Sequence, residues 1–225
     1  SPAKYKYGLT ATLKRKDGKE RIVLMQLGPV RYKDLSKVTS ELGHKVLVQE
    51  TGISMDASKA EYTTNEIYDY LYINPIRNTQ ILMDVRNCLD EKRYPIILTE
   101  RKEHIELLGQ ELSDYVKVYK LHGGLKKKER EAIMEELQNL PESEKRVIIA
   151  TSKYVGEGFD YPILDTLFLT LPISWSGRVK QYAGRLHREY HEKKEVRIYD
   201  YVDSKIDSSM KMYGKRCKGY RSMGY

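Results

Sequence analysis

The chain has 225 residues, of which 40% are hydrophobic, so it can form one large domain or one domain with appendages. Its formal net charge of +8 favours a polyanionic partner such as nucleic acid, although a charge of this size also serves solubility alone. No apolar run approaches the ~18 residues that span a bilayer, which argues against a membrane partner. Cys88 and Cys217 form no C-x-x-C pair, and His187 and His191 have no accompanying ligands, so no metal site is expected.

Residues 1–75 have the least regular pattern of the chain. The apolar run Ile22–Leu27 predicts a strand that ends at Gly28-Pro29, and a second strand is expected over residues 45–50. Between residues 60 and 90 the pattern is mainly helical, with Pro75 at the start of a new helix.

From residue 95 onward, apolar runs alternate regularly with helical patterns. We expect strands over residues 95–99, 116–121, 147–151, 166–171 and 196–202. We expect helices over residues 101–112, 126–140 and 178–188, and a basic, helical tail over residues 204–225. Strands that alternate with helices form right-handed crossovers, so this is an α/β pattern with a mostly parallel central sheet covered on both faces.

A glycine-containing segment follows the strand expected at 147–151. Thr151 ends that strand, and the chain then reads Gly156-Glu157-Gly158-Phe159-Asp160 after four intervening residues. Glycines let the backbone approach a ligand, and ligands in open α/β sheets bind at the carboxyl ends of strands. The segment is therefore a candidate binding loop, with an ordinary turn as the alternative.

The segment 181–188 reads Q-x-x-G-R-x-x-R. On a helix, Gln181, Arg185 and Arg188 share one face, and Gly184 lets another surface approach closely. Two guanidiniums on one face suit a polyanion, because arginine is always charged and grips phosphate with a planar fork. The alternatives are a solvated basic face, or a structural ion pair with an acid such as Glu189 or Asp160.

These two segments resemble motifs V and VI of superfamily 2 helicases and nucleic-acid translocases, and Leu9-Thr10-Ala11-Thr12 resembles their motif III. The resemblance implies the C-terminal RecA-like lobe of a DEAD/DEAH-type helicase, with the three-layer fold of P-loop NTPases. Together with Arg15-Lys16-Asp17-Gly18, the motifs are similar to those of XPB-like DNA translocases and of bacterial helicases from restriction or conflict systems.

The sequence lacks the Walker A loop and the D-E-x-H box, which the first lobe of such enzymes carries. We therefore expect the chain to be the C-terminal half of a larger ATP-dependent helicase and to be inactive alone. Residues 1–75 are expected to hold the end of the first lobe and an inter-lobe or accessory segment. Residues 76–203 are expected to form the RecA-like helicase C-terminal domain, and residues 204–225 a basic tail. A reduced, cytoplasmic protein is expected.

The resemblance implies a role for each motif residue. Arg185 and Arg188 are expected to face ATP and Mg²⁺ bound mainly by the missing first lobe, with Arg188 as the arginine finger and Gln181 positioning the arginines. A further three residues are expected to contact the nucleotide or the other lobe: Gly156, Gly158 and Asp160, the last through the ribose or through motif VI.

Four residues are expected to contact the phosphate backbone of nucleic acid: Thr151, Thr99, Arg101 and Gly123. The expected function is thus the second lobe of a helicase or translocase that acts on DNA, with RNA as the alternative polymer. A non-catalytic nucleic-acid-binding or docking module stays open as a second function. A small-molecule phosphate enzyme is disfavoured, because the sequence has no evident nucleophile with its base.

Overall fold

The computed structural model describes residues 7–8, 19–32, 42–56, 61–156, 159–173, 176–188, 190–191 and 193–225. The chain divides into two compact units, residues 1–41 and 42–225. The motif III segment, residues 9–12, and Gly158 lie outside the described residues.

The expected strand at Ile22–Leu27 is wrong, because this run lies in the helix α1 (Glu20–Leu27) of the first unit. The amide of Gly28 donates to the Leu24 carbonyl at 2.8 Å, which is a helical hydrogen bond. Gly28 then turns the chain with a φ of +82°, a conformation that glycine adopts without steric cost.

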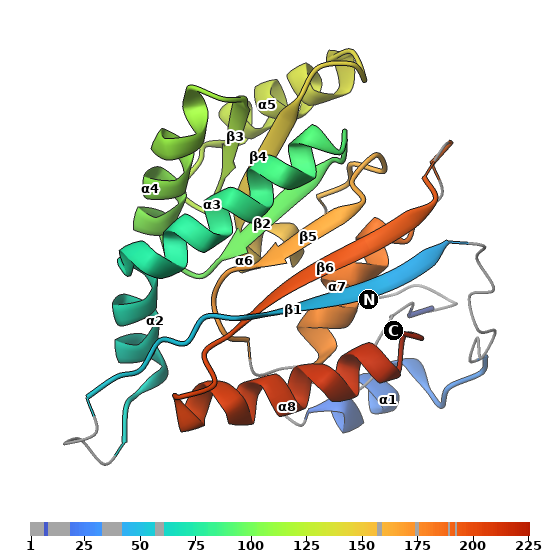
Figure 1. The fold of residues 1–225 in the computed structure, drawn as a ribbon. Helices are drawn as coiled ribbons and strands as arrows, with labels where there is room; N and C mark the ends of the chain where they lie inside the picture. The colour runs from blue at the N-terminus through green and yellow to red at the C-terminus, as the bar shows by residue number, and fades with distance from the viewer. Residues whose placement is uncertain are drawn as a thin grey trace. The chain divides into compact units, whose positions relative to one another are not determined.

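The second unit contains a six-stranded parallel sheet with the order β1-β6-β5-β2-β4-β3 (Figure 1). Its strands are β1 (Gly43–Glu50), β2 (Pro95–Thr99), β3 (Lys117–Leu121), β4 (Arg146–Thr151), β5 (Thr166–Leu169) and β6 (Glu195–Val202). Its helices are α2 (Thr64–Tyr72), α3 (Pro75–Asp90), α4 (Lys102–Ser113), α5 (Lys127–Asn139), α6 (Ser152–Gly156), α7 (Ser176–Leu186) and α8 (Asp207–Arg221). Among the described helices, none is long and apolar enough to cross a bilayer.

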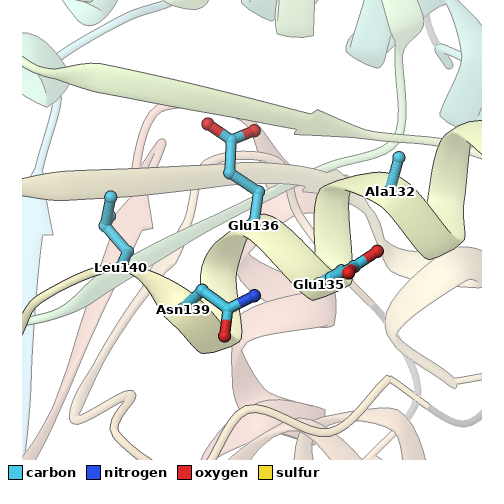
Figure 2. Close-up of a pocket in the computed structure, with 5 residues that line it drawn as sticks. All are labelled: Ala132, Glu135, Glu136, Asn139 and Leu140. Carbon is cyan, nitrogen blue, oxygen red and sulfur yellow. The ribbon is translucent and has the colours of Figure 1, made fainter.

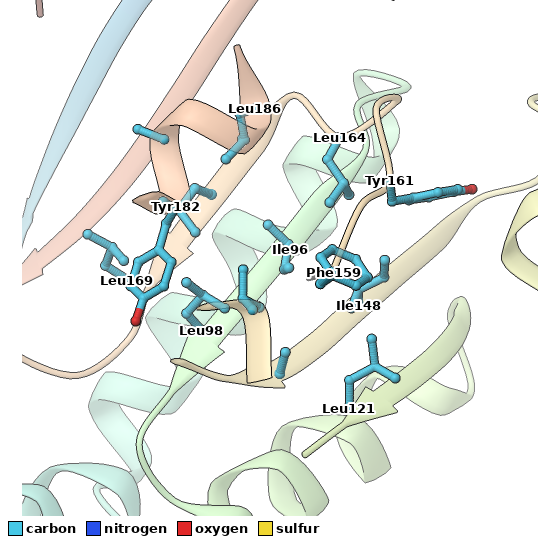
Figure 3. Packing of buried hydrophobic residues seen from close by; sticks show 14 of the residues in the cluster. Ile96, Leu98, Leu121, Ile148, Phe159, Tyr161, Leu164, Leu169, Tyr182 and Leu186 are labelled. Carbon is cyan, nitrogen blue, oxygen red and sulfur yellow. The ribbon is translucent and has the colours of Figure 1, made fainter. Parts of the chain in front are cut away.

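Helices cover both faces of the sheet. On one face, α3 and α4 pack against alternate strand residues such as Ile97. On the other face, α5, α6, α7 and α8 pack against the intervening residues, such as Ile96 and Leu98 (Figure 3). Successive side chains of a strand point to opposite faces, so a strand buried on both sides is apolar throughout. The predicted three-layer α/β fold with a parallel sheet is confirmed.

A smaller cluster forms where α2 meets the segments that follow β1, β5 and β6. Ile67 and Leu71 of α2 are fully buried there against Ile53, Leu171 and Ile206. A capping box between Thr63 and Glu66 starts α2 by satisfying backbone amides at its first turn. The cluster holds α2 beside the carboxyl ends of the strands.

Two segments outside the expected core region are part of the same unit. β1 pairs with β6 over eight residues, from Gly43↔Glu195 to Glu50↔Val202, although it lies in the stretch expected to be accessory. The tail forms α8, whose Arg216 binds Asp200 of β6 with an Nε–Oδ2 distance of 2.9 Å. The boundary between the compact units therefore falls between residues 41 and 42.

Candidate functional site

The carboxyl ends of the parallel strands meet at one edge of the sheet. Thr99 at the end of β2 pairs in register with Thr151 at the end of β4, and Leu121 at the end of β3 pairs with Ala150. The structure therefore brings the expected nucleic-acid contacts at the ends of three neighbouring strands to the same edge.

Thr99 is buried at this edge, with 1% of its surface exposed. Like Ile97, it points to the face that α3 and α4 cover. Its hydroxyl lies 3.0 Å from Nδ1 of His104 and accepts a hydrogen bond from the amide of Arg101 at 3.3 Å. The expected phosphate contact of Thr99 is corrected accordingly: its hydroxyl lies within the protein and holds the start of α4.

His104 extends this contact into a buried chain of hydrogen bonds. Its Nε2 lies 3.1 Å from Oδ1 of Asn78, and the amide nitrogen of Asn78 donates to the Tyr72 carbonyl at 2.7 Å. This arrangement assigns the proton to Nε2 and makes Nδ1 the acceptor for Thr99. Burial, with a smaller contribution from Arg77, lowers the pKa of His104 to about 3, so the ring is neutral. The junction of β2 and α4 is thereby fixed to α2 and α3.

Arg101, the expected phosphate ligand, is bound by α2. Its Nε donates to Oδ1 of Asp69 at 2.7 Å, and Nη2 donates to the carbonyl of Asn65 at 3.2 Å. Its guanidinium also lies 5.4 Å from the ring centre of Tyr68. A phosphate at this position would compete with the carboxylate of Asp69.

The two remaining expected contacts, Thr151 and Gly123, are accessible. Thr151 is partly exposed, and Gly123 is exposed in the turn after β3. In that turn, Nδ1 of His122 accepts from the amide of Gly124 at 3.1 Å, so the imidazole supports the turn. The amide and carbonyl of Gly123 therefore lie on a surface that a phosphate backbone could reach.

Motif VI forms α7 and the turn after it, and its two faces differ. Tyr182, Ala183 and Leu186 are buried, and Figure 3 shows Tyr182 and Leu186 among the core side chains. Gln181 and Arg188 are exposed, and Arg185 is partly exposed. The helix therefore carries an apolar face against the sheet and a polar side with Gln181 and Arg185, while Arg188 is exposed in the turn after the helix.

Both arginines contact the segment that holds Asp160. Nη1 of Arg188 lies 2.5 Å from Oδ2 of Asp160, in an ion pair whose side chains are 48% and 44% exposed. Arg185 donates to the carbonyl of Phe159, and burial followed by the charge of Arg188 lowers the pKa of Arg185. The ion pair considered as an alternative is thus present, and it joins two residues expected at the nucleotide. The backbone of Gly156 ends α6 just before this segment, where a loop was expected.

Several residues that shape the site carry no signal in the sequence. Asp69 precedes its partner Arg101 by 32 residues, and Lys193 binds only backbone carbonyls near Arg188 among the described residues. His104 lies on the apolar face of α4, where sequence alone does not separate packing from function.

Other hollows in the described part of the chain lie away from these residues. Figure 2 shows the residues that line an open pocket along α5. Its lining residues are Ala132, Glu135, Glu136, Asn139 and Leu140. Among the described residues, no three His, Cys, Asp or Glu side chains group closely enough to hold a metal ion.

Comparisons with known proteins define the class. Residues 78–189 match the family of the helicase conserved C-terminal domain. This range includes β2, β4, Asp160, Arg185 of α7 and Arg188 in the turn after it. That part of the chain is therefore a helicase C-terminal domain.

Relatives and solved structures agree with this assignment. A protein of Acanthamoeba polyphaga mimivirus, named as an ATP-dependent RNA helicase, is 24% identical over 238 residues, which cover 99% of this chain and 43% of that protein. The transcript termination protein of fowlpox virus (strain NVSL) is 23% identical over 119 residues, or 53% of this chain and 25% of that protein. The chain thus spans less than half the length of either relative.

Two crystal structures share the fold. T4 UvsW superposes with a TM-score of 0.61 at 16% identity, over 81% of this chain and 40% of that chain. The C-terminal part of the Fun30 ATPase domain superposes with a TM-score of 0.55 at 15% identity, over 72% of this chain and 52% of that chain. The likeness supports the RecA-like helicase architecture of the sheet and its helices.

Proposed function

We propose that this chain supplies the second RecA-like lobe of a superfamily 2 helicase or translocase, which hydrolyses ATP between this lobe and a first lobe of the same protein. The observation that carries the proposal is the pair of arginines at the end of α7 and in the turn after it. Two guanidiniums lie there beside one carboxylate, on a surface open to another lobe.

In this proposal, Asp160 is the resting partner of Arg188. The pair is about half exposed, and exposed ion pairs contribute only about 0–1 kcal/mol. A γ-phosphate held by the first lobe can therefore draw the guanidinium away at little cost. Arg188 then offsets charge on the transferring phosphoryl group, while Arg185 stays bound to the backbone at Phe159.

Nucleic acid is proposed to bind at the carboxyl ends of β3 and β4, with the neighbouring end of β2. Thr151 and Gly123 offer a hydroxyl and backbone groups, and Arg101 offers a guanidinium once Asp69 releases it. These contacts reach phosphate rather than base edges, which predicts weak sequence preference and strong salt dependence. DNA is the proposed polymer, and an assay with both polymers separates it from RNA.

ATP hydrolysis by the full-length protein, with and without DNA or RNA, tests the proposal. Arg188→Ala should lower kcat by about 10³-fold or more, because it removes the guanidinium that offsets charge on the transferring phosphoryl group. Arg221→Ala is the matched control, since Arg221 is exposed at the end of α8, and its rate should equal that of the native protein. Unchanged hydrolysis in Arg188→Ala would favour the non-catalytic binding or docking module instead.

A further inference from the structure

The ammonium group of Lys193 donates three hydrogen bonds, all to backbone carbonyls. Two acceptors, Leu186 at 3.0 Å and Arg188 at 3.0 Å, belong to the end of α7 and the turn after it. The third is Pro162 at 2.5 Å, two residues after Asp160. One side chain therefore joins the turn that carries Arg188 to the loop that carries its partner.

A cation suits this place for two reasons. The last carbonyls of a helix have no donor within the helix, and they carry the negative end of its dipole. His187 in the same turn makes two further contacts. Its ring stacks on that of His44 of β1 with 4.4 Å between the ring centres, and its Nε2 lies 2.8 Å from the Tyr225 hydroxyl. Those rings orient His187, whereas Lys193 reaches both the end of α7 and the Asp160 loop, as Arg185 also does through the Phe159 carbonyl.

We infer that Lys193 is a positioning residue for the arginine finger. Its three hydrogen bonds fix the backbone of Arg188 relative to Asp160, and so determine where the guanidinium lies when the carboxylate releases it. The inference rests on the proposed function, because it assigns Lys193 to the same reaction. It predicts an effect on the chemical step and little effect on nucleotide affinity.

The charge of Lys193 makes this role sensitive to pH. Burial lowers the pKa of Lys193 to about 8, and the carboxylate of Asp165 acts in the opposite direction. His187 faces the ammonium and is neutral at this pH, since burial, with smaller contributions from His44 and Lys193, lowers its pKa to about 4. Above the pKa of Lys193, the amine keeps two N–H donors for three carbonyls, so one contact is lost.

The first test compares kcat and KM for ATP in full-length variants with saturating nucleic acid. Lys193→Met should lower kcat about 10-fold and change KM less than about 2-fold, because the finger is displaced while the nucleotide site stays intact. Lys194→Met is the matched control: Lys194 is exposed and takes no part in these three bonds. Lys193→Arg keeps the charge and should restore most of kcat.

A double variant separates this inference from the proposed function. If Arg188 is the finger and Lys193 positions it, Lys193→Met should have no further effect on kcat in the Arg188→Ala background. The same 10-fold loss in both backgrounds would overturn the positioning role and leave the finger standing. An Arg188→Ala protein with native kcat would overturn both.

Two further measurements do not depend on Lys193→Met being active. The kcat of the native protein should fall above pH about 8, and Lys193→Arg should remove that fall, because guanidinium stays charged. Amide hydrogen exchange at residues 186–188 should be faster in Lys193→Met than in Lys194→Met. Identical pH profiles for the native protein and Lys193→Arg, or identical exchange in the two methionine variants, would contradict the inference.

Discussion

Arg101 lies where it could bind a phosphate, but its guanidinium is bound to Asp69 in the structure. The guanidinium lies at the N-terminus of α4, where a phosphate would also gain from the helix dipole. Asp69 is 60% exposed, so the contact is weak and water can reach it. The carboxylate of Asp69 therefore competes with a phosphate for the guanidinium of Arg101.

Removing that competitor should strengthen nucleic-acid binding. We expect Asp69→Asn to raise the affinity of the full-length protein about 3-fold, and to steepen the dependence of log K on log salt by roughly 0.9 for a duplex. Fluorescence anisotropy across a salt series measures both quantities. Asp114→Asn is the control of equal charge change, because Asp114 follows the opposite end of α4, and its salt slope should match the native one.

An affinity that falls in Asp69→Asn would mean that Asp69 orients Arg101 for binding. An unchanged slope would remove Arg101 from the set of phosphate contacts.

At the scale of elements, a buried ion pair joins α8 to β6. Arg216 and Asp200 are each 1% exposed, and the Tyr220 hydroxyl donates to the same carboxylate oxygen at 2.7 Å. A second nitrogen of Arg216 donates to the carbonyl of Ile173 at 3.2 Å, just before α7. The tail helix therefore braces both the sheet and the entry to α7.

Breaking this pair should destabilise the fold strongly. Arg216→Met leaves Asp200 as a buried charge with Tyr220 as its one remaining side-chain donor among the described residues, and we expect a loss of about 3 kcal/mol or more in the free energy of unfolding. The change is measured by urea unfolding of the 225-residue chain. Lys215→Met, at an exposed neighbour, should stay within about 0.5 kcal/mol of the native value.

Replacing both partners, as in Arg216→Met with Asp200→Leu, should cost less than Arg216→Met alone, because no charge is then buried unpaired. A larger loss in the double variant would contradict this account of α8.

The elements also show what sequence patterns can predict. The strand at Pro95–Thr99 was predicted to the residue, since a β-branched run bounded by proline and a polar residue fits a short buried strand. The run at Ile22–Leu27 has a similar composition, yet it is helical. A run this short does not distinguish the helical period of 3.6 residues from the strand period of two. Tertiary contacts decide whether such a run becomes a helix or a strand, and the local sequence does not identify those contacts.

The candidate site also has features that local sequence patterns predict and features that they do not. The shared face of Gln181, Arg185 and Arg188 is predicted from helical spacing alone, but α7 ends at Leu186, so Arg188 lies in the turn after the helix. The burial of Thr99 and the binding of Arg101 to Asp69 depend on which face of the sheet α3 covers and where α2 lies. Such contacts join segments distant in sequence, so no local pattern reveals them.

At the scale of the whole molecule, residues 42–225 form one compact unit that includes β1 and α2. β1 covers the edge of β6 along eight residue pairs, and α2 closes the cluster around Ile53 and Leu171. A helicase domain that began near residue 76 would lack both elements.

We therefore expect residues 42–225 to unfold in one cooperative thermal transition, and residues 76–225 to aggregate or melt at lower temperature. Without β1, the largely buried strand β6 becomes an open edge that can pair with another chain. Circular dichroism and size-exclusion chromatography of the two fragments check this. Equal melting temperatures and monomeric behaviour would instead support a boundary near residue 75.

The pairing of β1 with β6 also has a consequence for biosynthesis. β1 leaves the ribosome first among the strands of the sheet, and its neighbour β6 leaves last. At ~5–20 residues per second, the roughly 150 residues from Gly43 to Glu195 take on the order of 10–30 s to translate. During that interval β1 has no native strand with which to pair. The nascent chain therefore depends on chaperones, or on slow collapse of the inner strands, to keep β1 from pairing with a non-native strand.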